Sequence, residues 1–151
     1  MKLPQPVISA GVWALENGHR TLLALTGGRF PHSIAGMPTL ELHTIGAKTG
    51  ERRSRLLTSP IVEDGRVVLV GSNGGGATSP SWVANLRANP EVEITMGDTT
   101  HRYRARIVTG DERAELWTRV VKRYRGYATY QRRAPREIPV VVCERIDAGA
   151  G

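Results

Sequence analysis

The residues whose types and spacing best suit chemistry form one basic segment, Gly46-Ala47-Lys48-Thr49-Gly50-Glu51-Arg52-Arg53. Apolar runs precede and follow it, so we expect a tight turn between two strands. Its two glycines let the backbone turn and leave amide groups uncovered. Exposed amides beside lysine and arginine suit an anion, most often a phosphate or a carboxylate. An ordinary basic hairpin has the same composition, and this segment alone does not separate the two interpretations.

Two further segments offer donors to the same kind of anion. Residues 71–76 form a glycine-rich loop, and a helix is expected to start with Ser79 as its N-cap. A helix start carries free amides and a partial positive charge. With the basic turn, these segments describe a cleft for a long polyanion with a flat head. Trp82 packs against that head or in the core, and Asn85, one helical turn on, either bonds the ligand or faces solvent.

Three of the four tyrosines, Tyr124, Tyr127 and Tyr130, recur at three-residue spacing. On a helix they would form one slowly drifting stripe, which usually indicates core packing. Here the flanking side chains are cations rather than leucines: Lys122, Arg123, Arg125, Arg132 and Arg133. Phenol groups at the entrance of a site can donate hydrogen bonds to carbonyl or nitro oxygens.

Other kinds of catalytic site find no support in the sequence. A Ser-His-Asp order, paired carboxylates at helical spacing and a P-loop lysine are all missing, which disfavours hydrolysis and phosphoryl transfer. The four histidines lack metal-ligand spacing, so no metal is expected. An enzyme of this composition would depend on a bound organic cofactor for the difficult step.

Length and charge bound the remaining possibilities. The 151 residues fit one domain, and the net charge of +7 favours nucleic acid, anionic lipid or polyanionic small molecules. Nucleic acid is not expected as a partner, because helix-turn-helix, RNP and zinc-finger patterns are missing. Cys143, the single cysteine, lies in an apolar run and agrees with a reducing cytosol. The sequence shows neither a signal peptide nor an apolar run of membrane-spanning length.

The expected elements are mostly strands joined by hairpins. Apolar spacing predicts one kinked helix or two short helices over about 6–25. This segment covers a barrel mouth, acts as a lid or touches a membrane surface. The expected strands are 39–45, 54–62, 66–70, 91–96, 100–108 and 138–146, and the expected helices are 79–89 and 111–124, with an extension to 130 as an alternative. A capping box is expected from Thr109 to Glu112. Strands and helices do not alternate regularly, so the predicted class is α+β, mainly antiparallel, with a barrel of about six strands and peripheral helices.

Taken in order, these motifs resemble the deazaflavin-dependent nitroreductases of actinobacteria, a family with a split β-barrel fold. The resemblance covers roughly residues 38–146. The matching blocks are Gly46 to Gly50 with Arg53, Asp64 to Val68, Ser72 to Gly75, Pro80 to Trp82, Asn85 to Pro90, Asp111 to Ala114, the three tyrosines, and Ile138 to Glu144. Relatives often carry a lysine where this chain has Asn73.

The resemblance implies that the cofactor is coenzyme F420, an 8-hydroxy-5-deazaflavin with a polyanionic phospholactyl-oligoglutamate tail. FMN is less expected, because its single phosphate needs no long cationic groove. The implied cofactor-binding residues are Ala47, Lys48, Thr49, Arg53, Ser54, Arg55, Leu56, Leu57, Thr58, Val70, Gly71, Ser72, Asn73, Ser81, Trp82, Val83, Ala84, Asn85 and Tyr127. Among these, Lys48, Thr49 and Arg53 would hold the tail, and residues 54–58 would run along the ring.

The implied reaction is hydride transfer from reduced F420 to an electron-poor acceptor such as a quinone, a nitro compound or an enone. Ser72 and Tyr130 would be catalytic, and Tyr124, Tyr127 and Tyr130 would line the substrate entrance. A carrier that binds F420 without turnover and an FMN-dependent split-barrel oxidoreductase stay open as alternatives. The expected organisation is an N-terminal helical segment and loop over 1–37, the cofactor-binding domain over 38–146 and a disordered tail over 147–151. The protein is expected to be a cytoplasmic monomer or homodimer, with peripheral contact to the inner face of the membrane.

Overall fold

The computed structural model describes residues 33–146, which form eight strands and three α-helices. The strands are β1 (Ser33–Ile34), β2 (Met37–Ile45), β3 (Arg52–Thr58), β4 (Ile61–Glu63), β5 (Arg66–Val70), β6 (Glu91–Met96), β7 (Thr99–Ile107) and β8 (Val140–Arg145). The helices are α2 (Ser81–Ala88), α3 (Gly110–Arg123) and α4 (Gly126–Arg133), with a short turn η1 (Asn73–Gly75) before α2.

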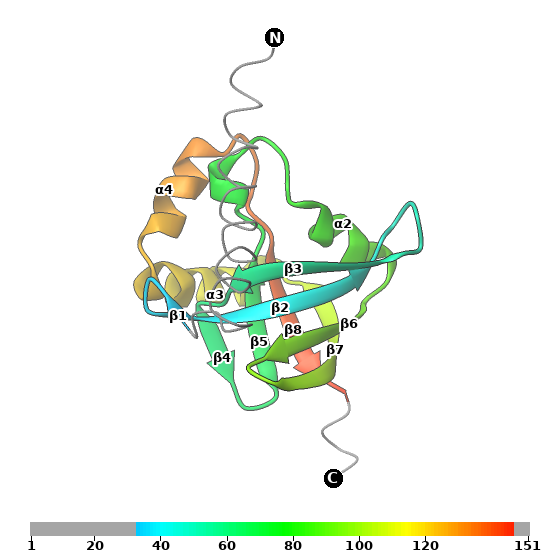
Figure 1. Cartoon of the computed structure of the whole chain (residues 1–151). Coiled ribbons are helices and arrows are strands. Elements are labelled where there is room, and N and C mark those ends of the chain that lie inside the picture. The colour runs from blue at the N-terminus through cyan, green and yellow to red at the C-terminus, as the bar shows by residue number, and fades with distance from the viewer. Residues whose placement is uncertain (1–32, 147–151) are drawn as a thin grey trace, which may run out of the picture.

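All strand pairs are antiparallel, in the order β1-β2-β6-β7-β8-β5-β4, with β3 added beside β2. The sheet curls into a split β-barrel, which confirms the expected fold class. Figure 1 shows β2 and β3 crossing in front of β5 and β8, with α2 near one end and α3 and α4 near the other. Five of the six expected strands are found with boundaries shifted by at most two residues.

Two apolar clusters hold these layers together. One fills the barrel beneath α2 and includes Leu40, Leu42, Trp82 and Leu86. The other lies between the sheet and the helices α3 and α4, with Val120 fully buried at its centre. Leu40 and Leu42 of β2 are two residues apart and share one face of the strand, since successive residues point to opposite faces. Both belong to the cluster inside the barrel.

Strand β3 lies at the split of the barrel. It pairs with β2 along its whole length, from Arg52 opposite Ile45 to Thr58 opposite Thr39. Its other edge pairs with no strand among residues 33–146. An edge without a strand partner can pair with another chain segment or a ligand.

The expected strand 54–62 is wrong as a single element. It breaks at Ser59 and Pro60, because proline cannot donate to a strand ladder. The Ser59 hydroxyl, which is fully buried, donates to the carbonyl oxygens of Val68 and Ile61 at 2.6 and 2.9 Å. The break lets the chain turn away from β2 and begin β4, which raises the strand count above the six expected.

The helix ends also differ from expectation. The N-cap of α2 is Pro80 rather than Ser79, and Thr109 caps α3 without a side-chain hydrogen bond. The expected capping box does not form, because both carboxylate oxygens of Glu112 accept from Arg106 at 2.7 and 2.9 Å. The extension of α3 to residue 130 is wrong, since the extended backbone of Tyr124 separates α3 from α4.

Several expectations fall on residues outside 33–146, namely the N-terminal helix and the C-terminal tail. Within the described range, no helix combines the length and the apolar character that a membrane span requires. Cys143 is fully buried, and burial raises the pKa of its thiol to about 12. The thiol is therefore protonated at neutral pH and is not a nucleophile.

Candidate functional site

The basic turn between β2 and β3 uses most of its own amides. Gly46 donates to the carbonyl oxygen of Glu51 at 2.7 Å, and Gly50 donates back to that of Gly46 at 2.8 Å. The amide of Glu51 donates to the Thr49 hydroxyl at 3.2 Å. Within the described part of the chain, only the amides of Lys48 and Thr49 in this turn have no recorded acceptor. The turn therefore offers fewer free amides to an anion than the sequence suggested.

Asn85 joins this turn to helix α2. Its side-chain oxygen accepts from the amide of Ala47 at 2.9 Å, and its side-chain nitrogen donates to the Thr44 hydroxyl at 3.1 Å. The residue is 8% exposed. Asn85 therefore orients the basic turn, whereas the sequence left a choice between ligand contact and exposure to solvent.

Two arginines of β3 face helix α2. Arg53 pairs with Thr44 and Arg55 pairs with Leu42, so both side chains lie on the barrel side of the sheet. The guanidinium of Arg55 donates to the hydroxyl of Ser81, the first residue of α2, at 3.3 Å. Arg53 also approaches Glu51 of the turn at 3.2 Å. Cations and the start of a helix thus meet at one place.

The glycine-rich loop after β5 has an unusual backbone. Asn73, Gly74 and Gly75 all have positive φ, at 47°, 64° and 83°. A Cβ on Gly75 would lie 2.9 Å from the carbonyl oxygen of Tyr130, so only glycine allows α4 to approach this closely. Asparagine tolerates the left-handed region better than most residues, which suits its place at position 73.

The three tyrosines do come together, although they do not lie on one helix. Their ring centroids are 5.3 Å apart for Tyr124 and Tyr127, 6.0 Å for Tyr127 and Tyr130, and 6.4 Å for Tyr124 and Tyr130. The ring of Tyr124 folds against Gly126, where a Cβ would lie 2.4 Å from it. This contact explains the break between α3 and α4 and gives a cluster rather than a stripe.

The pKa values of two phenols in this cluster are raised. A hydrogen bond to Tyr124, together with partial burial, raises the pKa of Tyr130 above 10. Burial raises the pKa of Tyr127 to about 12. Both hydroxyls are protonated at neutral pH, so they can donate hydrogen bonds and Tyr130 can supply a proton.

The predicted site residues close into one ring of contacts. From Arg55 of β3 the ring passes through Ser81 to Val83, whose methyl group lies 2.9 Å from the position of a Cβ on Gly71. It continues through the loop to Gly75 and Tyr130, and Tyr127 interacts with Thr58 at the end of β3. Elements that are far apart in sequence are thus linked back to β3, whose other edge pairs with no strand among residues 33–146.

Some predicted residues offer little side chain to a ligand. The side chains of Trp82, Val83, Leu56 and Tyr127 are all less than 9% exposed, and Trp82 belongs to the barrel core. The hydroxyl of Tyr127 also donates to the sulfur of Met37 at 3.8 Å. Ser81 and Ala84 are exposed on the outer side of α2, and the half-buried Ser72 and Asn73 lie in the loop. The contacts assigned to all these residues remain predictions.

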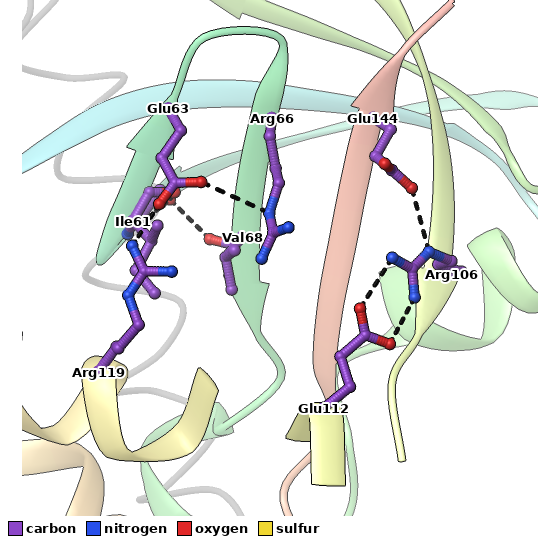
Figure 2. A network of polar contacts seen from close by, with 9 residues as sticks. Ile61, Glu63, Arg66, Val68, Arg106, Glu112, Arg119 and Glu144 are labelled. Carbon is purple, nitrogen blue, oxygen red and sulfur yellow. Dashed lines mark hydrogen bonds and ion pairs between the residues drawn. The ribbon is translucent and has the colours of Figure 1, made fainter. Parts of the chain in front are cut away.

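Many of the other cations are neutralised away from this ring. Figure 2 shows Arg119 and Arg66 on either side of Glu63, and Arg106 between Glu112 and Glu144. A cavity of about 610 Å³ lies in the same region, and none of its described lining residues belongs to the predicted site. The arginines of β3 differ among themselves: Arg52 and Arg53 pair with Glu93 and Glu51, whereas Arg55 contacts the Ser81 hydroxyl.

Sequence reasoning missed two residues that shape the site. Thr44 receives the Asn85 side chain, and Arg136 binds several groups of the loop after β5. Arg136 lies in a basic run with Arg132 and Arg133. Only its position after Pro135, just beyond the end of α4 at Arg133, distinguishes it in the sequence.

Comparisons with known proteins agree on one family. The sequence model of the F420H(2)-dependent quinone reductase family matches residues 18–145. A Mycobacterium tuberculosis protein named as an F420H(2)-dependent quinone reductase is 42% identical over 132 residues, which cover 84% of this chain and 87% of that protein. A solved structure of an F420-H2 dependent reductase is 38% identical with a TM-score of 0.64, and covers 71% of this chain and 94% of its own. A second solved structure, described only as a domain-swapped dimer, is 34% identical with a TM-score of 0.67, and covers 87% of this chain and 97% of its own.

The Asn85 bridge yields a prediction about stability. Asn85→Ala leaves the amide of Ala47 and the Thr44 hydroxyl without their partner. We expect the free energy of unfolding, measured by urea denaturation, to fall by about 1–3 kcal/mol. The matched control is Asn89→Ala at the C-cap of the same helix, where the loss should stay within about 0.5 kcal/mol. Equal losses in the two variants would show that the bridge adds nothing specific.

Proposed function

The chain belongs to the F420H(2)-dependent quinone reductase family, and from that premise we propose how its residues serve hydride transfer from reduced coenzyme F420 to a quinone. It is an oxidoreductase with F420 as its cofactor, as the resemblance implied. The observation that supports the assignment of residues is the ring of contacts that runs from Arg55 of β3 through α2 and the loop after β5 to Tyr130.

The residues present suit a flat ring with a polyanionic tail. The free edge of β3 and the loop after β5 offer main-chain groups, and the split between them suits a flat molecule. Lys48 and Arg53 stand at the end where the basic turn meets α2, and they would hold the phosphate and carboxylates of the tail. When bound, F420 supplies the hydride, so the protein needs no nucleophile of its own.

The chain's own residues position the reactants and deliver a proton. Tyr130 adjoins the loop at Gly75 and keeps its proton at neutral pH, so it can donate to an oxygen of the acceptor. The hydroxyl of Ser72, on the same loop, is the second candidate donor. Tyr124 and Tyr127 pack edge to face and limit access of water. Orientation and placement of donors are thus the protein's contribution.

The basic turn gives a prediction about affinity. Lys48→Ala removes a charge-assisted contact to the cofactor tail, which should weaken F420 binding roughly tenfold to a hundredfold. Titration of F420 against intrinsic tryptophan fluorescence measures the dissociation constant. The control is Lys122→Ala, the other lysine of the described range, for which we expect a change of about twofold or less. If Lys48→Ala binds F420 like the parent chain, the tail lies elsewhere.

Turnover distinguishes a reductase from a carrier. The protein should oxidise reduced F420 when menadione is added, and the absorbance of the cofactor follows the reaction.

Tyr130→Phe should lower kcat roughly tenfold or more, while the dissociation constant of F420 changes little. Because the hydrogen bond to Tyr124 raises the pKa of Tyr130, its donor role should persist from neutral into alkaline pH. A variant that loses affinity but keeps kcat would contradict this role, and absence of turnover with quinones, nitroaromatics and enones would favour a carrier.

Membrane contact is the remaining part of the proposal. Arg125, Arg132 and Arg133 are exposed on the segment that carries the tyrosine cluster. Cations in this position would turn the substrate entrance toward an anionic bilayer, where apolar quinones dissolve. The expected N-terminal contact lies outside the described residues.

Vesicle sedimentation tests this surface. The protein should bind vesicles that contain anionic phospholipid and release them at high salt. Replacing Arg125 and Arg132 with glutamine should weaken binding by roughly 2 kcal/mol, about thirtyfold in the partition coefficient. Unchanged partitioning of this double variant would remove these arginines from any membrane surface.

A further inference from the structure

Arg136 uses every donor of its guanidinium group on one loop. Its Nε–H donates to the carbonyl oxygen of Gly76 at 3.1 Å. One terminal nitrogen donates to the carbonyl oxygen of Gly71 at 3.2 Å and to the Ser79 hydroxyl at 2.9 Å. The other donates to the carbonyl oxygens of Ser72 and Thr78, both at 3.0 Å. A guanidinium has five N–H donors, and this one has five acceptors.

None of these five acceptors is a carboxylate. The ion pairs of Arg52, Arg106 and Arg119 each include a glutamate, whereas Arg136 faces only carbonyl and hydroxyl oxygens. Partial burial lowers the pKa of Arg136, but a guanidinium remains charged at neutral pH. The loop therefore encloses a cation that no acidic partner in residues 33–146 neutralises.

The position of this cation determines where the loop amides point. In a trans peptide the N–H lies opposite the C=O, and no peptide bond in the described chain is cis. Since the carbonyls of Gly71 and Ser72 face Arg136, the amides of Ser72 and Asn73 face away from it. Neither amide has a recorded acceptor among the described residues. Two donors are thus presented side by side, and the charge on the carbonyl side polarises both peptide groups.

We propose that Arg136 is the positioning residue of the cofactor site, which fixes the loop 71–79 so that the amides of Ser72 and Asn73 bind an oxygen or ring nitrogen of the deazaflavin. This inference rests on the proposed function. Arg136 itself does not touch the cofactor. Its effect passes through the carbonyls of Gly71 and Ser72, and it should appear as affinity for F420.

The path of the loop has supports apart from Arg136. The amide of Gly71 donates to the carbonyl oxygen of Pro139 at 2.9 Å, and Gly75 packs on the backbone of Tyr130. Loss of Arg136 should therefore loosen the loop without unfolding the barrel. Hydrogen exchange followed by mass spectrometry tests this without any cofactor. In Arg136→Ala the segment 71–79 should exchange faster while β5 and β8 keep their protection, and unchanged exchange in 71–79 would overturn the proposal.

Fluorescence titration of F420 tests the consequence for binding, at a temperature where circular dichroism shows each variant folded. Arg136→Ala should raise the dissociation constant roughly tenfold or more. Arg136→Lys should recover little of the loss, because an ammonium cannot supply five coplanar donors. The matched control, Arg87→Ala, removes an exposed arginine of α2 and should change the constant by about twofold or less. Full affinity in Arg136→Ala or in Arg136→Lys would overturn the proposal.

Chemical rescue separates the shape of the group from its charge. Ethylguanidinium added to Arg136→Ala should restore F420 affinity, whereas the same concentration of ethylammonium should not. Ser79→Ala removes one acceptor, keeps the guanidinium and should cause a smaller loss in the same direction. Equal rescue by both cations, or no loss in Ser79→Ala, would contradict a site set by the five hydrogen bonds. If the parent chain does not bind F420, the proposed function fails. The exchange experiment distinguishes this outcome, because it tests without cofactor whether Arg136 fixes the loop 71–79.

Discussion

The need of main-chain polar groups for partners governs this structure. A closed barrel would pair every strand edge, but the split leaves one edge of β3 without a neighbour in the described chain. Side chains then satisfy the nearby groups selectively. The Asn85 side chain accepts a hydrogen bond from an amide of the basic turn, and Arg136 donates to carbonyl oxygens of the loop after β5. The amides of Lys48, Thr49, Ser72 and Asn73 have no recorded acceptor among residues 33–146, and these are the amides assigned above to the proposed ring and tail.

The pairing of charged side chains also differs between the surroundings of the split and the rest of the surface. The chain carries +7, yet the arginines on β7 and on the outer side of α3 are held by Glu63, Glu91, Glu112 and Glu144. Such exposed pairs add little stability, so their main effect is to reduce the positive potential away from the split. Arg136 differs because its partners carry no charge. The field that an anionic cofactor meets is therefore set by a few cations, whereas the composition alone suggested a diffuse basic surface.

The sequence was informative where one residue type has one structural use. Gly-containing hairpins and alternating strands predicted a small antiparallel barrel, and the family resemblance carried by the ordered motifs implied the split barrel and F420 as cofactor. It was less informative where a side chain has several partners to choose from. Glu112 had the spacing of a capping box but binds Arg106, and Ser79 had the place of an N-cap but accepts from Arg136. Trp82 and Asn85 were each left with two interpretations, which only tertiary contacts can separate. Arg136 has no local signal, because its five acceptors lie more than fifty residues earlier.

The tyrosine cluster shows why separation from the core helices matters for the chemistry. If α3 continued to residue 130, the three rings would drift around a helix. The extended backbone at Tyr124 instead brings the rings within 6.4 Å of one another and sets Tyr130 against the loop at Gly75. The hydrogen bond to Tyr124 and partial burial raise the pKa of the Tyr130 phenol, so the group is a donor rather than a base at neutral pH. An acceptor that receives a hydride needs a proton source nearby, and in the proposed mechanism this phenol would meet that need without a histidine or a carboxylate.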